Sequence, residues 1–548
     1  MKKHLLCGLL LSLCVLFGAG TALARDGKVT LYSINHLQSR LLPAQITTKQ
    51  PSPSVGGLSW AASVVKADMQ KSVNPIFVTT GEVVAGTMWR YFKGRPEMTA
   101  LSKAGAAVNM LGKHEFDYGL DHLKEALSQT DIPIVISNLV TQDPDLKKSL
   151  RKNLVLQAGD MKVGFFGLLS PGIMRLTNRP KGVSLDPDLG AVAREMVADL
   201  RRKGADVIVL LSGLYDNEST ALARSVPGIH VITGSGAPVE ETDKPIFIDD
   251  PEGGTTVLIW SGVWAKFVGR LGLSLKDGKL DRQDTSWKLL PVSDRTAPDP
   301  GVLAVAVEYD QKLNQALKRV VGRFEQSIDA RNKTLRSGEA PIGNFITDSF
   351  RWKTGADAAL TNSGGIRGNV IYPAGEFSER NLSDLLPFGD RLFVLTLTGR
   401  ELRRALELSA SALIREEGDD YDPLERLHTG AFLQISGLKV VYDLSAPPTL
   451  VSGDRVAAPG RRLKSLAVLR DGEWREIGDE DTCTVATTNW MVNGGGGEKY
   501  EMLRNAPHTE AGCFDFDAFV EYLTVVHGGR ARLQREGRIS LVNGRAKE

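Results

Sequence analysis

The chain has 548 residues, which is too long for one hydrophobic core and indicates two domains of ordinary to large size. Hydrophobic residues make up 42% and charged residues 24% of the chain, and the formal net charge is +2. Lys and Arg are scattered along the sequence, so nothing predicts the basic stripe with which proteins follow a nucleic-acid backbone. We therefore expect no nucleic-acid polymer among the partners.

The first 24 residues have the pattern of a secretory signal peptide. Lys2 and Lys3 provide a positive start, and Leu5 to Phe17 form an apolar run that is short for a membrane span. Cleavage is expected after Ala24, in the small-x-small sequence Ala22-Leu23-Ala24. An uncleaved anchor is the alternative, which the short run disfavours. We expect a periplasmic or secreted protein without stable membrane insertion.

Two of the four cysteines belong to this signal, and Cys483 and Cys513 remain. An oxidising compartment would permit a disulfide between them. Because the sequence does not give the distance between them, a disulfide and two free thiols stay open as alternatives.

Residues 28–288 alternate short apolar runs with amphipathic stretches. Helical spacing of apolar residues is clearest over 58–69. Such alternation predicts a layered α/β domain with helices on the faces of its sheets. The strand-like runs lie at 29–34, 75–79, 132–136, 162–167 and 206–211.

A domain boundary is predicted near residues 291–300, which are rich in Pro, Asp and Ser. The stretch 302–320 has helical spacing with alternating charges, and it fits either a connecting helix or the first helix of the second domain. A second α/β unit with Gly-rich loops follows. We assign the ranges 1–24 (signal), 25–297 (first domain), 298–321 (linker helix) and 322–548 (second domain).

The second unit contains a series of Gly-, Asn- and aromatic-containing blocks. They are Pro341-Ile342-Gly343-Asn344-Phe345, Asn362-Ser363-Gly364-Gly365-Ile366-Arg367, Leu386-Pro387-Phe388-Gly389-Asp390, Gly430-Ala431-Phe432-Leu433-Gln434 and Thr488-Asn489-Trp490. In this order and spacing the set resembles the C-terminal, substrate-binding domain of the 5′-nucleotidase family. The resemblance implies a nucleotide or nucleoside as the ligand.

The chemistry of these residues agrees with the resemblance. Gly364 and Gly365, beside Asn362, allow the backbone to approach a ligand closely. Arg367 can hold an anionic phosphate through two parallel hydrogen bonds.

The resemblance also implies a base held between two rings, here Phe432 and Trp490, and stacking contributes roughly 1–3 kcal/mol per base. Gln434 would then read the base edge. Glu498 would hold the ribose hydroxyls in place of the family's Asp. The alternative is that both aromatic residues belong to the hydrophobic core.

The first unit resembles the family's metallophosphoesterase domain over its whole length. This resemblance implies a four-layer αββα fold and two divalent cations held by Asp, His and Asn side chains at strand ends. Nearly every ligand motif is altered. His36 and Gln38 replace the Asp and His of Asn-Asp-x-His, Glu82 replaces the bridging Asp of Gly-Asp, Lys113 replaces the Asn of Gly-Asn-His, Gly213 replaces the His of Leu-Ser-His, and Ser235 and Ala237 replace both His residues of Gly-His-Ser-His.

His114 and Asp117 match the family's catalytic His and the Asp that orients it. A structural role for this pair is an equal alternative to a vestigial catalytic one. We expect Lys113 to form an ion pair with Glu82 in place of the metals. No cofactor is therefore expected, and Mn, Zn, Mg or Co would bind only if the site has been rebuilt.

Two functions follow from this pattern. In the first, the chain keeps nucleotide or nucleoside binding and has lost dimetal hydrolysis, because the changes are concentrated at the metal positions. In the alternative, it is an active phosphoester hydrolase with a site rebuilt around Glu82, Lys113 and His114. A protein partner is compatible with the first function, but the sequence does not specify one.

Overall fold

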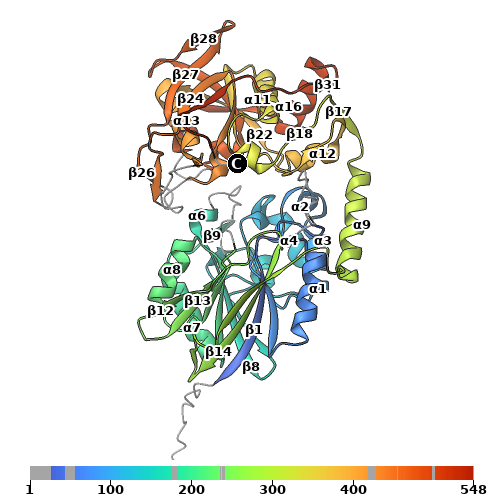
Figure 1. The fold of residues 1–548 in the computed structure, drawn as a ribbon, viewed down its shortest axis with the longest axis vertical. Helices are drawn as coiled ribbons and strands as arrows, with labels where there is room; N and C mark the ends of the chain where they lie inside the picture. The colour runs from blue at the N-terminus through green and yellow to red at the C-terminus, as the bar shows by residue number, and fades with distance from the viewer. Residues whose placement is uncertain are drawn as a thin grey trace, which may run out of the picture.

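The computed structural model describes residues 26–43, 56–174, 182–234, 236, 241–416, 427–452, 455–495 and 500–546. The predicted signal peptide, Ser235, Ala237 and Glu498 lie outside these ranges. The N-terminal and C-terminal parts lie one above the other, and helix α9 (Pro300–Ala316) runs along one side between them (Figure 1).

Two sheets form the centre of the N-terminal part. The first has the order β15-β14-β1-β2, with β16 also paired to β14. Its strands are β1 (Gly27–Ile34), β2 (Pro75–Thr79), β14 (Phe267–Lys276), β15 (Lys279–Leu280) and β16 (Ser286–Pro291). The second sheet has the order β12-β13-β11-β10-β8-β7. Its strands are β7 (Asn153–Ala158), β8 (Met161–Leu169), β10 (Val207–Gly213), β11 (Val231–Thr233), β12 (Ile246–Asp249) and β13 (Thr255–Ile259).

Alternate residues of these strands enter different cores, as expected where a sheet is buried on both faces. In β1, Val29 and Leu31 join the core between the two sheets. Ile34 faces the other way, toward helices α1 (Leu58–Met69), α3 (Arg95–Ala104) and α9. In β10, Ile208 and Leu210 face α7 (Leu189–Arg202) and α8 (Asp216–Ser225). The predicted four-layer αββα arrangement is therefore confirmed.

Helix α9 packs against the N-terminal part through Val302, Val305 and Ala306. It begins with Asp299, whose side chain accepts a hydrogen bond from the Val302 N–H at 2.9 Å, and with Pro300 in its first turn. The predicted helix ran to residue 320, but the helix stops at Ala316 because the next residues enter strand β17 (Val320–Phe324).

The C-terminal part is built on a five-stranded sheet of order β23-β19-β29-β22-β30. These strands are β19 (Ala358–Asn362), β22 (Arg391–Thr398), β23 (Leu433–Ser436), β29 (Thr482–Thr488) and β30 (His508–Phe514). Helix α13 (Gly399–Ser411) covers one face of the sheet. Helices α11 (Pro341–Thr354) and α16 (Asp515–Glu521) cover the other.

A second C-terminal sheet has the order β28-β27-β24-β32, and a smaller one has the order β21-β17-β31. Their strands are β24 (Leu438–Asp443), β27 (Leu463–Arg470), β28 (Glu473–Glu476) and β32 (Ile539–Val542), and β21 (Gly375–Ser378) and β31 (Arg530–Ala531) beside β17. Short helices that matter for the site are α2 (Gly86–Phe92), α4 (Gly119–Ser128), α12 (Glu379–Leu385) and α14 (Asn489–Val492).

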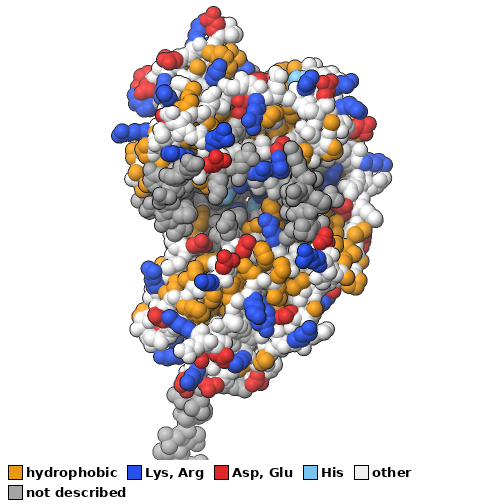
Figure 2. Space-filling view, viewed as in Figure 1, with side chains coloured by type: hydrophobic (Ala, Val, Ile, Leu, Met, Phe, Trp, Pro, Cys, Tyr) orange, Lys and Arg blue, Asp and Glu red, His pale blue; other side chains and the backbone are white. Residues whose placement is uncertain are grey.

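Cys483 is buried, Cys513 is half-buried, and both are free thiols. On the face shown in Figure 2, Lys and Arg side chains are interspersed with Asp and Glu. Within the described ranges, no helix combines the length and apolarity that a bilayer span requires.

Candidate functional site at the interface of the two parts

The N-terminal and C-terminal parts meet through helix α2, the loop before α4, and α12 with the loop that follows it. The Thr87 hydroxyl donates to the Ser383 carbonyl, and the Tyr118 hydroxyl donates to the Pro387 carbonyl, each at 2.8 Å. The Arg90 guanidinium lies over the Phe516 ring, 5.2 Å from its centroid. These contacts bring the strand ends of the first part against the Gly-rich loops of the second.

Glu82 occupies the position predicted for the bridging metal ligand, and it is fully buried. One carboxylate oxygen accepts from the Lys113 backbone N–H, and the other lies 3.1 Å from the Lys113 Nζ atom. The same oxygen lies 3.5 Å from His114 Nε2 and 3.7 Å from His36 Nδ1. The structure thus contains the Lys113–Glu82 ion pair predicted from the sequence.

Electrostatics keep Glu82 ionised in this buried position. Burial alone would raise its pKa, but Lys113, His114 and His36 outweigh that effect and hold the pKa at about 2. The neighbouring Glu115 behaves in the opposite way. Burial and the charge of Glu82 raise the pKa of Glu115 to about 8, while its oxygens accept from the N–H groups of Val83 and Gly112 at 2.9 and 2.8 Å.

The predicted dyad is present. His114 Nδ1 lies 2.7 Å from Asp117 Oδ2, across the single turn His114–Phe116. This contact fixes the ring orientation and leaves Nε2 directed toward Glu82.

At two other positions where the sequence predicts altered metal ligands, neighbouring side chains fill the space or bind the residue. A side chain at Gly213 would meet Leu169 Cδ1 at 2.8 Å and Met110 Cε at 3.0 Å, so the space that a ligand would use is filled by core side chains. Gln38 accepts a hydrogen bond from the Trp264 indole N–H at 3.0 Å. Across the described ranges, no group of three or more His, Cys, Asp or Glu side chains is arranged to hold a metal ion. With an ammonium beside Glu82, these residues do not fit a two-cation centre.

Several residues around Glu82 have a strained backbone conformation. Within the described residues, twelve non-glycine residues have positive φ, and six of them surround this site. Left-handed backbone is unfavourable for such residues and tends to persist where function or local packing requires it. The six are His36 (φ 44°), Gln38 (51°), Ser39 (57°), Glu82 (54°), Trp264 (61°) and Ala265 (53°).

Three arginines lie at the interface: Arg40 comes from the N-terminal part, and Arg336 and Arg367 come from the C-terminal part. Burial lowers the pKa of Arg367, and the positive charge of Arg40 lowers it further, while Asp117 and Glu82 raise it. Burial, with a contribution from Arg367, lowers the pKa of Arg336 to about 10. None of the three forms a hydrogen bond or ion pair between its side chain and another described residue. The cluster therefore offers unpaired guanidinium groups to an anion.

The surroundings of Arg336 and Arg367 agree with the absence of ion pairs. The Nε atom of Arg336 is buried without a hydrogen-bond partner in the part of the chain that the structure describes. Arg367 lies over the Phe388 ring, 5.4 Å from its centroid. Arg40 and Arg336 were not predicted from the sequence, although Arg40 follows the Asn35–Gln38 block by two residues and Arg336 precedes helix α11.

The residues predicted to hold the nucleoside are less accessible. Phe432 and Gln434 are both completely buried. The Gln434 amide donates to the carbonyls of Leu335 and Gly338 at 2.9 and 2.8 Å and accepts from Ala340 N–H at 3.1 Å. In this arrangement Phe432 belongs to the core and Gln434 holds the loop that carries Arg336.

Trp490 is half-buried and borders Gly495, where a Cβ atom would overlap the indole. Asn362 is buried, and its Nδ2 atom lies 3.4 Å from the Gly430 carbonyl oxygen. Gly364 and Gly365 keep the loop before Arg367 close to this position, since a side chain at either would press on Asn362.

Two further carboxyl groups lie at this interface. Burial, together with the charge of Asp117, raises the pKa of Asp390 to about 7. Burial also raises the pKa of Asp515, and the charge of Asp390 adds to this effect. Asp390 is the last residue of the block at 386–390 that the sequence identifies, and it is buried.

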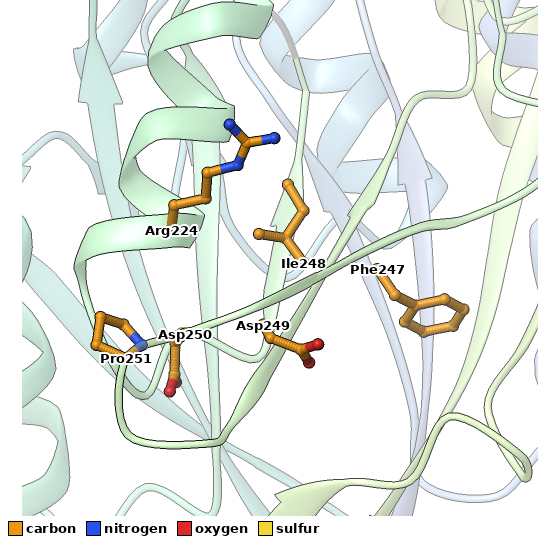
Figure 3. A pocket seen from close by; sticks show the side chains of 6 residues that line it. All are labelled: Arg224, Phe247, Ile248, Asp249, Asp250 and Pro251. Carbon is orange, nitrogen blue, oxygen red and sulfur yellow. The ribbon is translucent and has the colours of Figure 1, made fainter.

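An open depression of about 490 Å³ lies elsewhere, beside β12 and α8 (Figure 3). Its acidic groups are engaged locally: Asp250 accepts from the N–H groups of Glu252 and Gly254, and Asp249 pairs with Arg282. It contains none of the predicted site residues and supports no functional assignment.

Comparison with known proteins agrees with the fold. The family model described as 5′-nucleotidase, C-terminal domain, matches residues 320–505. The trifunctional nucleotide phosphoesterase protein YfkN of Bacillus subtilis is 26% identical over 506 residues, which cover 85% of this chain. The match spans only 33% of YfkN, so this chain corresponds to about a third of that protein.

Two further proteins match over most of their length. The 5′-nucleotidase of Diplobatis ommata is 24% identical over 529 residues, covering 90% of this chain and 86% of that protein. The crystal structure of a 5′-nucleotidase precursor from Thermus thermophilus superposes with a TM-score of 0.76 at 26% identity, covering 94% of this chain and 100% of that one. The match to the C-terminal domain model, the similarity to these relatives and the shared two-part fold agree with one another. The chain therefore belongs to the 5′-nucleotidase family.

Proposed function

We propose that this chain is an exported nucleotide-binding protein of the 5′-nucleotidase family that has lost dimetal phosphoester hydrolysis. It binds the phosphate end of a nucleotide at the interface of its two parts. The observation that carries the proposal is the contrast at this interface between a Glu82 neutralised by Lys113 and three arginines with no anionic partner among the described residues.

The arginine cluster supports phosphate binding. The charge of Arg40 lowers the pKa of Arg367, and the charge of Arg367 lowers the pKa of Arg336. Like charges brought together in a half-buried place are unfavourable without an anion. A phosphate offers several acceptor oxygens and up to two negative charges, which match two or three guanidinium groups.

The surroundings of Glu82 support the loss of dimetal hydrolysis. Two divalent cations need several O and N ligands that converge from different loops. Here the Lys113 ammonium lies 3.1 Å from a carboxylate oxygen of Glu82, the residue at the predicted bridging position. Core side chains fill the space beside Gly213. We derive no catalytic step through metals from these residues.

The nucleoside end is expected to contribute less than the phosphate end. Phe432 is buried and Gln434 is engaged with the Arg336 loop, so Trp490 is the predicted stacking residue with partial exposure. We therefore expect AMP to bind much more tightly than adenosine, and inorganic phosphate to compete with AMP.

Isothermal titration calorimetry tests this function. Wild-type protein is titrated with AMP, adenosine and inorganic phosphate, and elemental analysis of the same sample measures bound Mn, Zn, Fe, Co and Ni. We expect saturable AMP binding and less than one metal per chain. Absence of heat at millimolar AMP, with Arg367→Ala indistinguishable from wild type, would remove the proposal. Arg475→Ala, which changes an exposed arginine on β28, is the matched control.

A second candidate is a metal-independent hydrolase that uses Glu82, Lys113 and His114. The 2.7 Å contact between His114 and Asp117 favours it, because that contact holds the imidazole in a defined orientation. Chelator-resistant turnover of AMP, UDP-sugar or p-nitrophenyl phosphate that is lost in His114→Ala would support this candidate. Complete inactivity would exclude it.

A further inference from the structure

Arg40 is the arginine of the cluster that comes from the N-terminal part, and its guanidinium rests on an aromatic ring. The Cζ atom of Arg40 lies 5.3 Å from the centroid of the Trp264 ring, within the range of a cation–π interaction. Lys266 places its ammonium 5.2 Å from the same ring. The indole therefore lies within cation–π range of two positive charges.

The Trp264 ring is fixed by the segment in which the metal ligands are expected. Its indole N–H donates to Gln38 Oε1 at 3.0 Å, and its backbone N–H donates to the His36 carbonyl at 2.9 Å. Its carbonyl accepts from the Gly57 N–H at 3.0 Å. Trp264 holds this position with φ of 61°, and Ala265 follows at 53°, so an unfavourable backbone conformation is kept here.

We propose that Trp264, anchored by Gln38, is a positioning residue that holds the Arg40 guanidinium toward the bound phosphate. The inference rests on the proposed function, because it assumes that Arg40 contacts an anion. Gln38 thereby has a role in place of the metal-binding His that the family resemblance implies at this position. Gln38 orients the indole, the indole orients Arg40, and Arg40 faces the C-terminal part.

This chain of contacts is physically reasonable for anion recognition. A free arginine side chain samples many rotamers, and ordering it on binding opposes affinity. A guanidinium already seated on a ring keeps its N–H groups in the ring-parallel plane, where they remain available to an acceptor. Across the interface, Asp384 and Tyr372 are the ionisable groups that influence Arg40, and Asp384 is already paired with Arg380 at 2.9 Å.

The test measures AMP affinity by calorimetry for wild type, Trp264→Leu, Trp264→Phe and Gln38→Leu. Trp264→Leu removes the ring face and should weaken the Kd roughly 3- to 10-fold. Trp264→Phe keeps a ring face but has no N–H for Gln38 to hold, so it should weaken the Kd by less than Trp264→Leu does. Gln38→Leu should weaken the Kd by a smaller factor, because the ring remains but loses its anchor.

A double-mutant cycle separates positioning from general damage. In the Arg40→Ala background, Trp264→Leu should cause no further loss of affinity, since the ring then has no guanidinium to hold. An equal loss in both backgrounds would overturn the inference, as would wild-type affinity in Trp264→Leu. Trp474→Leu removes an exposed Trp that also lies under a cation, Lys439, and should leave the Kd unchanged.

The outcomes distinguish this inference from the proposed function. If Arg40→Ala and Arg367→Ala both leave AMP binding unchanged, the proposed function fails. If Arg40→Ala weakens binding while Trp264→Leu does not, only the positioning role fails. Should Trp264→Leu not fold, Gln38→Leu replaces it, and wild-type affinity in Gln38→Leu would contradict the inference.

Discussion

The two sides of the interface differ in whether their charged side chains form ion pairs with other described residues. On the N-terminal side, Glu82 is buried and neutralised by Lys113 within the chain. Across from it, Arg336 and Arg367 carry positive charge without an ionic partner in the described residues. A site that supplies its own counter-charge is complete without a ligand, whereas a site that lacks one is prepared for a ligand. This difference is what the proposed function predicts, in which the Glu82 side has become structural and the arginine side binds phosphate.

The largest expected effect is on stability, from breaking the Glu82 ion pair. Lys113→Met leaves a buried carboxylate without its main partner and should lower the free energy of unfolding by about 3–5 kcal/mol. Urea denaturation at pH 7 measures it. The double variant Glu82→Gln with Lys113→Met should recover most of the loss. A single variant as stable as wild type would mean that another group neutralises Glu82.

The next effect is a pH dependence from Glu97, which accepts from the Ser39 hydroxyl at 2.5 Å beside Arg40. Burial raises its pKa from 4.5 to about 7. Because the folded pKa lies above the unfolded one, this group stabilises the fold fully below pH 4.5, and that contribution disappears as the pH rises through 7. The contribution of Glu97 to the free energy of unfolding is up to about 3 kcal/mol.

Glu97→Gln should remove this part of the pH profile. Compared with wild type, the variant should gain stability between about pH 5 and 8, and the difference should be constant above that range. Denaturation midpoints at several pH values measure it. Parallel profiles for the two proteins would show that Glu97 keeps an ordinary pKa.

A smaller effect is expected on ligand affinity from the arginine side. Arg367→Ala should weaken AMP binding roughly 30-fold, corresponding to about 2 kcal/mol for a lost charge-assisted contact. Stability of the free protein should stay the same or increase, because a half-buried charge that forms no ion pair with another described residue is removed. Calorimetry and denaturation on the same sample check both. Loss of stability with unchanged affinity would reverse the comparison between the two sides.

The smallest effect concerns the filled space at Gly213. Gly213→Ala should destabilise the fold by about 1 kcal/mol, because its Cβ atom would press on Leu169 and Met110. Gly338→Ala is the matched control, since a Cβ atom there meets nothing within 4 Å. Equal stability of the two variants, measured by urea denaturation, would show that the space beside Gly213 is open.

Much of the fold follows from local patterns. The helix predicted at 58–69 is α1 (Leu58–Met69), and the strand predicted at 75–79 is β2 (Pro75–Thr79). Both depend on periodicity over neighbouring residues. The end of α9 was less predictable, because its last predicted residues pair instead with strand β21, more than fifty residues away along the chain.

The site was predictable by position but not by environment. The order of blocks located Glu82, Lys113 and Arg367, and opposite charges explain the first two. Burial of Phe432 and engagement of Gln434 with the loop at Leu335 depend on packing across distant segments. The convergence of Arg40 with Arg367 depends on how the two parts meet, which no local pattern encodes.

On the proposed function, this site binds phosphate through arginines and without metals. The most direct test of this proposal is AMP titration of the full chain before and after exhaustive treatment with a chelator, with Mn²⁺ added back to one portion. We expect the same Kd in all three samples. Binding that disappears on chelation and returns with Mn²⁺ would contradict the account.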